Sequence, residues 1–233
     1  MKELIKQCFE SYNLPINDVQ AEKFAKFYDY LVCENQKFNL TAITEKKEVA
    51  IKHFVDSVLP IKDIPHGAKV IDVGTGGGFP GVPIKIMRDD VEIVLLDSLQ
   101  KRIKFLEEVK KLLNLNKTTC VHSRAEDYVR ETREKFDVAL SRAVASTPTL
   151  AEYLLPYVKV GGKVIMYKGS KGEEELKEGE RAIKELGGKL DKVERFSLKE
   201  VDSERIVFTI KKVGKTNAKY PRGKNLPKTK PIV

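Results

Sequence analysis

The sequence contains no long apolar run. A membrane-spanning helix needs roughly 20 consecutive apolar residues, whereas the apolar stretch at residues 91–96 is short and is interrupted by Glu92. Residues 1–12 mix charged and apolar side chains at helical spacing and lack the continuous apolar stretch of a secretory signal. We therefore expect no membrane-spanning segment and a location in the cytoplasm.

Cysteine is also scarce. The three cysteines, Cys8, Cys33 and Cys120, are an odd number at wide spacing, a pattern that fits neither a disulfide framework nor a zinc site. We expect reduced thiols and no bound metal ion.

Acidic residues are missing from the last part of the chain. Residues 211–233 contain eight basic residues and no acidic ones, so this segment carries almost all of the net charge of +9. Positive charge concentrated in one segment favours contact with a polyanion such as RNA. A solvated tail without a partner is the alternative.

The sequence before the basic segment predicts helices followed by an α/β domain. Residues 1–60 have helical spacing, and Asn17 with Gln20 resembles a capping box. Later, β-rich runs alternate with helical ones, which predicts a parallel sheet covered on both faces. We expect seven strands, at residues 69–73, 92–97, 118–122, 136–140, 163–168, near 193–198 and at 205–211.

The connection between the last two strands is informative. Residues 199–204 are too few for a parallel crossover, so the last strand is expected to be antiparallel. A mostly parallel seven-stranded sheet with an antiparallel last strand resembles the class I, Rossmann-like fold of S-adenosylmethionine-dependent methyltransferases. A nicotinamide-binding Rossmann sheet normally stays parallel throughout.

A glycine-dense turn follows the first expected strand. Residues 70–81 read VIDVGTGGGFPG, and Gly76, Gly78 and Gly81 even satisfy the GxGxxG pattern of dinucleotide sites, with Asp97 about twenty residues on. Asp72 argues against a dinucleotide, because a carboxylate near the ligand's centre would repel a pyrophosphate. S-adenosylmethionine offers an ammonium and a sulfonium there instead, so it is the expected cofactor.

Further candidate residues follow the next strands. Asp97 is placed to accept both ribose hydroxyls, and Ser98 is expected to cap the following helix. Residues 123–127 bring the Ala125 N–H and a carboxylate of Glu126 or Asp127 to the adenine edge, or are a solvated helix start. Arg142 follows the fourth strand, where this architecture presents the acceptor.

Two catalytic devices are absent from the acceptor side. There is no cysteine nucleophile for methylation of pyrimidine C5, and no Asn or Asp, Pro, Pro, aromatic tetrad for an exocyclic amine. A guanine N7 needs neither, because its lone pair is nucleophilic and carries no proton. Alignment by Arg142 would suffice, so we expect no general base and name no catalytic residue beyond this positioning role.

Several segments together resemble one bacterial family that methylates guanine N7 in ribosomal RNA of the small subunit, RsmG, also called glucose-inhibited division protein B. The resemblance covers nearly the whole chain. It rests on residues 38–43 (FNLTAI), 53–57 (HFVDS), 70–83 (VIDVGTGGGFPGVP), 123–126 (SRAE), 141–143 (SRA) and 220–231 (YPRGKNLPKTKP).

The resemblance implies methyl transfer from S-adenosyl-L-methionine to N7 of one guanine in the decoding-region loop of 16S ribosomal RNA, free or in the small subunit. The family's cofactor contacts fall on Gly74, Phe79, Asp97, Ser98, Leu99, Ala125, Glu126 and Arg142, to which the turn adds Asp72 and Gly76. The expected RNA contacts are Arg124, Lys219, Arg222, Lys224, Lys228 and Lys230.

We divide the chain into a helical extension (1–60), a methyltransferase core (61–212) and a basic tail (213–233), and expect a monomer. His53 and Asp56 have no assignable mechanism, and a packed helical pair is the favoured interpretation. The alternatives for function are a small-molecule methyltransferase, a dehydrogenase and a non-catalytic RNA-binding module.

Overall fold

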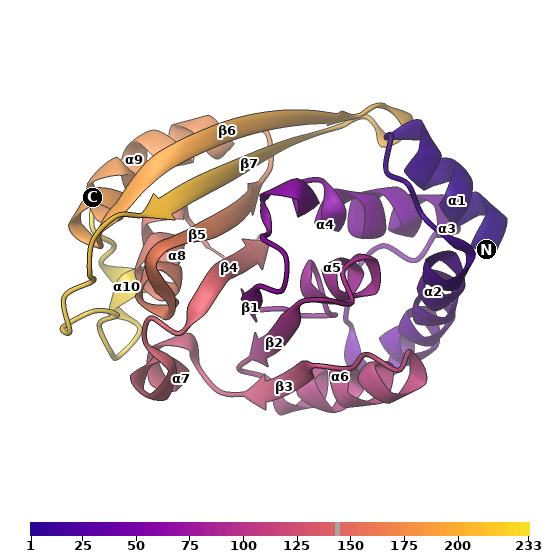
Figure 1. Ribbon diagram of the computed structural model, residues 1–233, viewed down its shortest axis with the longest axis horizontal. Coiled ribbons are helices and arrows are strands. Elements are labelled where there is room, and N and C mark those ends of the chain that lie inside the picture. The colour runs from indigo at the N-terminus through magenta and orange to yellow at the C-terminus, as the bar shows by residue number, and fades with distance from the viewer. Residues whose placement is uncertain (143–144) are drawn as a thin grey trace.

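The computed structural model describes residues 1–142 and 145–233, and it has one sheet with helices on both faces (Figure 1). The strands are β1 (Lys69–Val73), β2 (Glu92–Asp97), β3 (Thr118–His122), β4 (Phe136–Arg142), β5 (Val158–Lys168), β6 (Gly188–Leu198) and β7 (Ser203–Lys212). The α-helices are α1 (Lys2–Ser11), α2 (Asp18–Phe38), α3 (Lys46–Val49), α4 (Asp56–Val58), α5 (Gly81–Met87), α6 (Gln100–Leu112), α7 (Ala125–Thr132), α8 (Thr147–Leu154), α9 (Gly172–Glu185) and α10 (Leu226–Thr229). A π-helix, η1 (Ala50–Val55), joins α3 to α4, and the short 3-10 helices are η2 (Ile61–Asp63), η3 (Leu155–Tyr157) and η4 (Lys199–Val201).

The strand order is β3-β2-β1-β4-β5-β7-β6. Neighbours from β3 to β5 pair in parallel, whereas β7 pairs antiparallel with both β5 and β6. The predicted sheet and its antiparallel last strand are therefore confirmed. The expected capping box is also present, because Asn17 and Gln20 exchange hydrogen bonds of 2.9 and 3.0 Å at the start of α2.

The observed strand β5 begins five residues earlier than predicted, at Val158 instead of 163. Two glycines, Gly161 and Gly162, lie within the observed strand. Gly161 has a φ of +92°, and a Cβ on Gly162 would come within 2.5 Å of the Asp137 carbonyl oxygen on β4. Backbone freedom and close strand approach thus explain the glycines, and the β4–β5 register shifts at this point.

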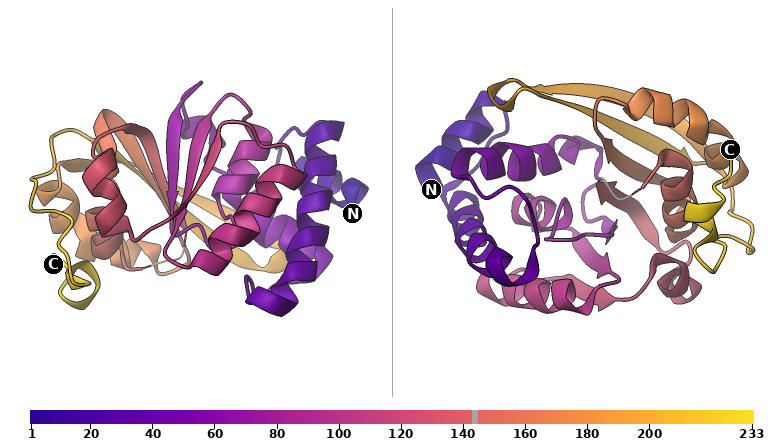
Figure 2. Two further views of the ribbon diagram at one scale, coloured as in Figure 1. Left: turned by 90° about the horizontal axis from the view of Figure 1, so that it is seen from below. Right: turned by 180° about the vertical axis from the view of Figure 1, so that it is seen from behind.

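Two hydrophobic clusters pack against opposite faces of the sheet. Alternate residues of each strand point to alternate faces; on β1, Val70 joins one cluster and Ile71 the other. The first cluster contains side chains of α1, α2, η1, α5 and α6, and the second contains those of α7, α8 and α9. Figure 2 shows the sheet between these two layers. Within the described residues, no helix is both long enough and apolar enough to cross a membrane.

The hairpin of β6 and β7 reaches across the molecule to the N-terminal helices (Figure 1). At its tip, Glu200 accepts a hydrogen bond of 2.7 Å from the Ser11 hydroxyl and lies 2.9 Å from the Lys47 ammonium. At the edge of the sheet, β6 carries a register irregularity between Leu190 and Lys192. The charged side chains around it are exposed at Lys189, Asp191, Lys192 and Arg195 and half-buried at Glu194.

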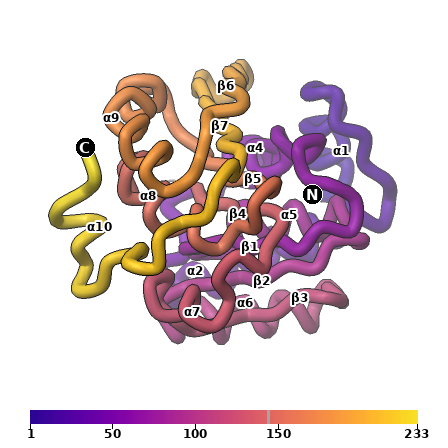
Figure 3. Tube along the Cα trace, turned by 60° about the vertical axis from the view of Figure 1, so that its left-hand side comes forward, coloured from indigo at the N-terminus to yellow at the C-terminus, as the bar shows by residue number. Residues whose placement is uncertain are grey.

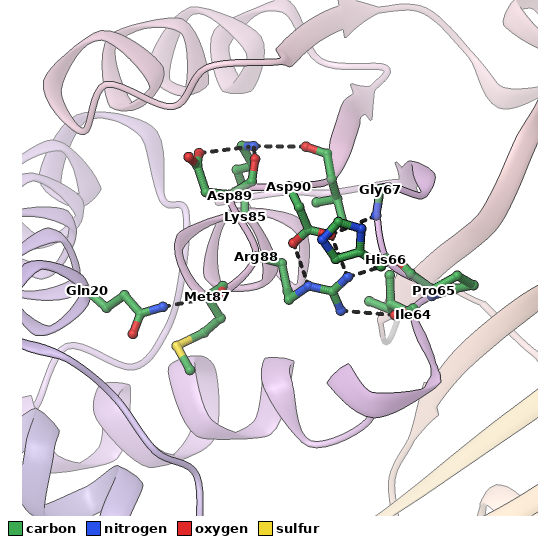
Figure 4. Close-up of polar contacts among 11 residues, drawn as sticks. Gln20, Ile64, Pro65, His66, Gly67, Lys85, Met87, Arg88, Asp89 and Asp90 are labelled. Carbon is green, nitrogen blue, oxygen red and sulfur yellow. Dashed lines mark hydrogen bonds and ion pairs between the residues drawn. The ribbon is translucent and has the colours of Figure 1, made fainter.

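A polar network fixes the amino ends of β1 and β2 (Figure 4). Arg88 donates to the Asp90 carboxylate at 2.7 Å and to the carbonyl oxygens of Ile64 and Pro65 at 3.0 and 2.9 Å. Buried Lys85 donates to the carbonyl oxygens of Asp89 and Val91. Because this network fixes where the two strands begin, it also fixes where their carboxyl ends meet.

The C-terminal segment is folded against the domain (Figure 3). Tyr220, Pro227 and Ile232 are buried, and α10 packs against α8. Arg222 forms an ion pair with fully buried Glu152 of α8, with nitrogen–oxygen distances of 2.6 to 3.2 Å. The segment is thus held to the domain by apolar burial and by an ion pair.

Candidate functional site: two cavities joined at the glycine turn

The glycine turn connects β1 to α5 at the carboxyl edge of the sheet. Gly74, Gly76 and Gly78 have φ values of +74°, +59° and +96°, a region that residues with a Cβ rarely adopt. Gly81 is required for another reason, because a Cβ there would lie 2.3 Å from Leu95 and 2.8 Å from the Asp72 carboxylate. Sterics therefore dictate both the path of the turn and the start of α5.

Asp72 lies beneath this turn and not in a cavity. Its side chain is 0% exposed, and Oδ2 accepts hydrogen bonds of 2.7 Å from the Thr75 hydroxyl and 2.8 Å from the Gly81 N–H. Burial raises the pKa of Asp72 to about 7. The expectation of a charged contact with the ligand is therefore corrected: this carboxyl group holds the turn together, and it is poorly suited to repelling a pyrophosphate.

Asp97 lies at the end of β2, facing the turn. Oδ2 accepts from the Gly76 N–H at 3.0 Å and from Arg102 at 3.2 Å, and Oδ1 accepts from the Leu99 N–H at 2.9 Å. The prediction that Ser98 caps the next helix is wrong. The N-cap residue of α6 is Leu99, which has no side-chain cap, and Asp97 takes up the free N–H at this end.

Two cavities of about 460 Å³ each open at this edge. We call the first the turn cavity; it is lined by Leu40, Thr41, His53, Gly74, Thr75, Gly76, Gly77, Phe79, Asp97, Ser98, Arg102 and Arg142. The second, the tail cavity, is lined by Val73, Gly74, Leu96, Asp97, Ser98, Ser123, Arg124, Ala125, Glu126, Ala145, Thr149, Tyr153, Asn225 and Lys228. Gly74, Asp97 and Ser98 line both, so the cavities meet at the tips of β1 and β2.

Most of the predicted cofactor residues come together here. At least one of the two cavities is lined by each of Gly74, Gly76, Phe79, Asp97, Ser98, Ala125, Glu126 and Arg142. Leu99 lines neither, and its side chain is exposed. Of the two acids considered at α7, Glu126 lines the tail cavity, whereas Asp127 pairs with Arg130 on the surface. Ala143 of the Ser-Arg-Ala motif lies outside the described residues.

Arg142, at the end of β4, is held by the N-terminal helical segment. Its guanidinium donates to Asp56 Oδ2 at 3.0 Å, to the Lys52 carbonyl oxygen at 3.1 Å and to His53 Nδ1 at 3.2 Å. It also lies over the Phe79 ring, 5.0 Å from the centroid. The other Asp56 oxygen lies 3.2 Å from Nε of Arg205 on β7. Asp56 thus links two arginines from different strands.

His53 is neutral in this arrangement. Burial, with a smaller contribution from the Arg142 charge, lowers the pKa of His53 to about 3. Its Nδ1 lies 3.2 Å from the Arg142 guanidinium, which only donates, and 3.1 Å from the Lys52 carbonyl oxygen, which only accepts, and its Nε2 lies 2.7 Å from the Thr41 hydroxyl. The imidazole also stacks on Phe79, with 4.6 Å between ring centroids.

A third cavity, of about 560 Å³, lies on the other side of Arg142. We call it the arginine cavity; it is lined by Ile43, Lys52, His53, Asp56, Arg142, Ala145, Tyr167, Lys168, Gly169, Glu175 and Arg205. Its lining shares only His53 and Arg142 with that of the turn cavity. These two side chains therefore form the boundary between the two spaces.

Residue-by-residue reasoning missed the contribution of the N-terminal segment. Leu40, Thr41, His53 and Asp56 all line a cavity, although the favoured interpretation of His53 and Asp56 was a packed pair. The available signals were the two segments FNLTAI and HFVDS, which carry these four residues.

The predicted RNA contacts fall into different environments. Lys219, Lys224, Lys228 and Lys230 are exposed, and Lys228 and Arg124 also line the tail cavity. Arg222 is corrected, because its guanidinium is engaged by buried Glu152 and anchors the tail. Lys212, counted in the basic segment, is fully buried in β7. Over residues 1–142 and 145–233, no group of three or more His, Cys, Asp or Glu side chains could hold a metal ion.

Comparison with known proteins identifies the family. A family model described as GidB, rRNA small subunit methyltransferase G, matches residues 20–206. Proteins named ribosomal RNA small subunit methyltransferase G from Lactobacillus johnsonii and Lachnoclostridium phytofermentans are 46% and 48% identical to this chain. The alignments cover 99% and 97% of this chain and 97% and 96% of those proteins.

Solved structures support the fold. An O-methyltransferase from Bacillus cereus in complex with SAH matches with a TM-score of 0.61 at 15% identity, over 91% of this chain and 100% of that one. A SAM-dependent methyltransferase from Aquifex aeolicus matches with a TM-score of 0.55 at 15% identity, over 72% and 94%. The expected class I methyltransferase fold is thus confirmed, and the chain belongs to the rRNA small subunit methyltransferase G family.

Proposed function

We propose that this protein transfers a methyl group from S-adenosylmethionine to ribosomal RNA of the small subunit, at N7 of one guanine in the decoding-region loop of 16S RNA. The observation that carries the proposal is the convergence of eight residues expected at the cofactor on two adjoining cavities, one of which is lined by Arg142. The names of the relatives support the ribosomal RNA substrate. In this proposal the protein acts as a monomer in the cytoplasm.

The residues of the two cavities fit the proposed cofactor. Asp97 lies where the cavities meet and offers carboxylate lone pairs to ribose hydroxyls, while Glu126 and the backbone of Ala125 line the tail cavity for the adenine edge. Arg102 and Arg142 line the turn cavity and suit the cofactor's carboxylate. When bound, S-adenosylmethionine supplies a methyl group activated by a sulfonium.

The protein's own contribution is alignment. Guanine N7 has an in-plane lone pair and no proton, so the reaction needs no general base. Arg142 is fixed by three hydrogen bonds and lies at the end of the turn cavity, where it can orient the acceptor. Neutral His53 and Phe79 stack on each other and pack against it.

The three segments of the chain have separate roles in this proposal. Residues 1–60 supply His53 and Asp56, residues 61–212 form the cofactor cavities, and residues 213–233 contact RNA. The exposed cations Lys219, Lys224, Lys228 and Lys230, together with Arg124, are the proposed phosphate contacts. Changing both Lys224 and Lys230 to Ala should reduce the salt dependence of RNA affinity by about two units of slope.

The direct test uses labelled S-adenosylmethionine and small-subunit RNA, both free and in assembled subunits. Wild-type protein should methylate one guanine at N7, located by nuclease mapping and mass analysis. Asp97→Asn should weaken cofactor binding, whereas the matched control Asp127→Asn changes a surface carboxylate that lines no described cavity.

Three results would reject the proposal. Transfer to a small molecule with no dependence on RNA would favour a metabolite methyltransferase, and RNA binding without transfer would favour a binding module. Competition of S-adenosylmethionine by NAD would favour a dehydrogenase.

A further inference from the structure

The arginine cavity has no role in the site described so far. It adjoins the turn cavity at His53 and Arg142 and the tail cavity at Ala145, so a group bound in it lies beside both spaces proposed for the methyl donor. Its volume of about 560 Å³ lies within the range of ligand pockets, roughly 300–1,000 Å³. Enzymes that modify a base commonly take it out of the stack into such a pocket.

We propose that the arginine cavity receives the target base and that the Lys168–Glu175 ion pair selects guanine by its Watson–Crick edge. The inference rests on the proposed function, because it takes the turn cavity as the place of the methyl donor. It adds the acceptor pocket and the residues that determine base specificity.

Two carboxylates line the cavity, and only one of them is available to a ligand. Asp56 is 2% exposed in its side chain and is engaged by Arg142 and Arg205. Glu175, in the first turn of α9, is 34% exposed in its side chain, and Lys168 is its ion-pair partner. A carboxylate has about four lone-pair positions, so Glu175 retains acceptor capacity toward the cavity.

Lys168 is held in a fixed position at the end of β5. Its side chain is 4% exposed, and its ammonium donates at 2.6 Å both to the Ala145 carbonyl oxygen and to Glu175 Oε2. Gly172 makes room for it, because a Cβ there would lie 2.9 Å from Lys168 Cβ. An ammonium has three donors, so one N–H remains for a ligand without breaking either bond.

The pair presents a donor beside an acceptor, which matches the edge of guanine. Guanine offers the O6 acceptor next to the N1–H and N2–H donors, so O6 can accept from Lys168 while N1 and N2 donate to Glu175. With N7 kept toward the methyl donor, adenine would turn its N6 amino group toward Lys168 and the N1 lone pair toward Glu175. Both contacts would be repulsive or unpaired, which is the strongest basis for rejecting a competing ligand.

The test uses 16S RNA with guanine, inosine or 7-deazaguanine at the target position and labelled S-adenosylmethionine. Inosine keeps N7, O6 and N1–H but lacks the N2 amino group, so it removes one of the proposed contacts with Glu175. The variant is Glu175→Ala, and its control is Glu173→Ala, on the same helix but paired with Arg195 outside the cavity.

Wild-type protein should prefer guanine to inosine by about 10-fold in kcat/KM, the effect of one hydrogen bond. Glu175→Ala should lower kcat/KM on guanine by about 30-fold or more and bring the guanine-to-inosine ratio close to one. Its affinity for S-adenosylmethionine should stay within about 2-fold of wild type, and Glu173→Ala should behave as wild type throughout.

The guanine-to-inosine ratio is independent of how much of the variant is folded, so a loss of stability cannot imitate the effect. A wild-type ratio retained in Glu175→Ala, in an otherwise active system, would overturn the inference and leave the proposed function standing. Methylation of the 7-deazaguanine RNA at the target, or no methylation of any RNA by wild type, would instead overturn the proposed function.

Discussion

The turn cavity and the arginine cavity adjoin each other, but they are built in different ways. Part of the turn cavity is formed by one stretch of backbone, residues 74–77, in which the positive φ values of Gly74 and Gly76 favour glycine. The arginine cavity is formed by side chains from η1, α4, β4, β5, β7 and α9, held by ion pairs such as Asp56 with Arg142 and Arg205. A backbone-built site is encoded in a local motif, whereas a side-chain-built site depends on long-range packing.

The largest effect is expected at Arg142, which lies between the turn cavity and the arginine cavity. Arg142→Ala should reduce the rate of methyl transfer by about 1,000-fold, or roughly 4 kcal/mol, because the acceptor loses its orienting group. Single-turnover transfer at saturating RNA and cofactor measures this. Arg102→Ala, which alters only the turn cavity, should mainly raise the dissociation constant for S-adenosylmethionine. Equal rate losses in both variants would mean that the boundary between the cavities has no special role.

Asp56 tests whether the arginine cavity depends on its ion pairs. Asp56→Asn removes the charge between Arg142 and Arg205, and breaking such a buried pair costs about 3 kcal/mol of unfolding free energy. As a positioning residue, Asp56 should affect kcat by about 100-fold while the affinity for S-adenosylmethionine stays close to that of wild type.

Asp63→Asn is the control for Asp56, because Asp63 pairs with Lys192 and Lys163 outside the cavities and should cost less than about 1 kcal/mol. Urea denaturation and steady-state kinetics separate the two effects. If kcat of Asp56→Asn followed only the folded fraction, its role would be structural.

The glycine turn should be sensitive to a single methyl group. Gly81→Ala places a Cβ 2.3 Å from Leu95, and relieving such overpacking costs about 2 kcal/mol of unfolding free energy. Gly77→Ala in the same turn should be tolerated, because its nearest neighbours would lie at 3.4 Å or beyond. Urea denaturation of the two variants checks this, and equal costs would show that the turn adapts to either substitution.

Acid should act in opposite directions on the stability contributions of His53 and of Asp72, the carboxyl group beneath the glycine turn. Burial lowers the pKa of His53 to about 3, below the unfolded value of 6.5, so its contribution to stability is lost as pH falls below 6.5. Burial raises the pKa of Asp72 to about 7, above the unfolded value of 3.8, so its contribution is present below pH 4 and is lost as pH rises toward 7.

Each group can change the slope of the unfolding free energy against pH by at most about 1.4 kcal/mol per pH unit. Unfolding free energies of wild type, His53→Gln and Asp72→Asn between pH 4 and 6.5 should therefore diverge with opposite slopes. Parallel curves for all three would argue against both shifts.

The sheet and the turn could be predicted from sequence because their signals are local. Strand alternation, the short link at residues 199–204 and the glycines each depend on neighbouring residues. The role of Asp72 could not be predicted, since the sequence does not show that Gly81 and Thr75 enclose it. The same holds for Arg222, whose partner Glu152 is seventy residues away, and for His53 with Asp56, whose function depends on Arg142.

The edge strand β6 has a consequence for how molecules of this protein meet in solution. An unpaired strand edge is a template on which another chain can add a strand. Alternating lysines, acids and an arginine, together with the irregularity near Lys192, make β6 a poor template, because an incoming strand would bury like charges and lose register. The β6 edge of the sheet should therefore resist the addition of a strand from a second molecule.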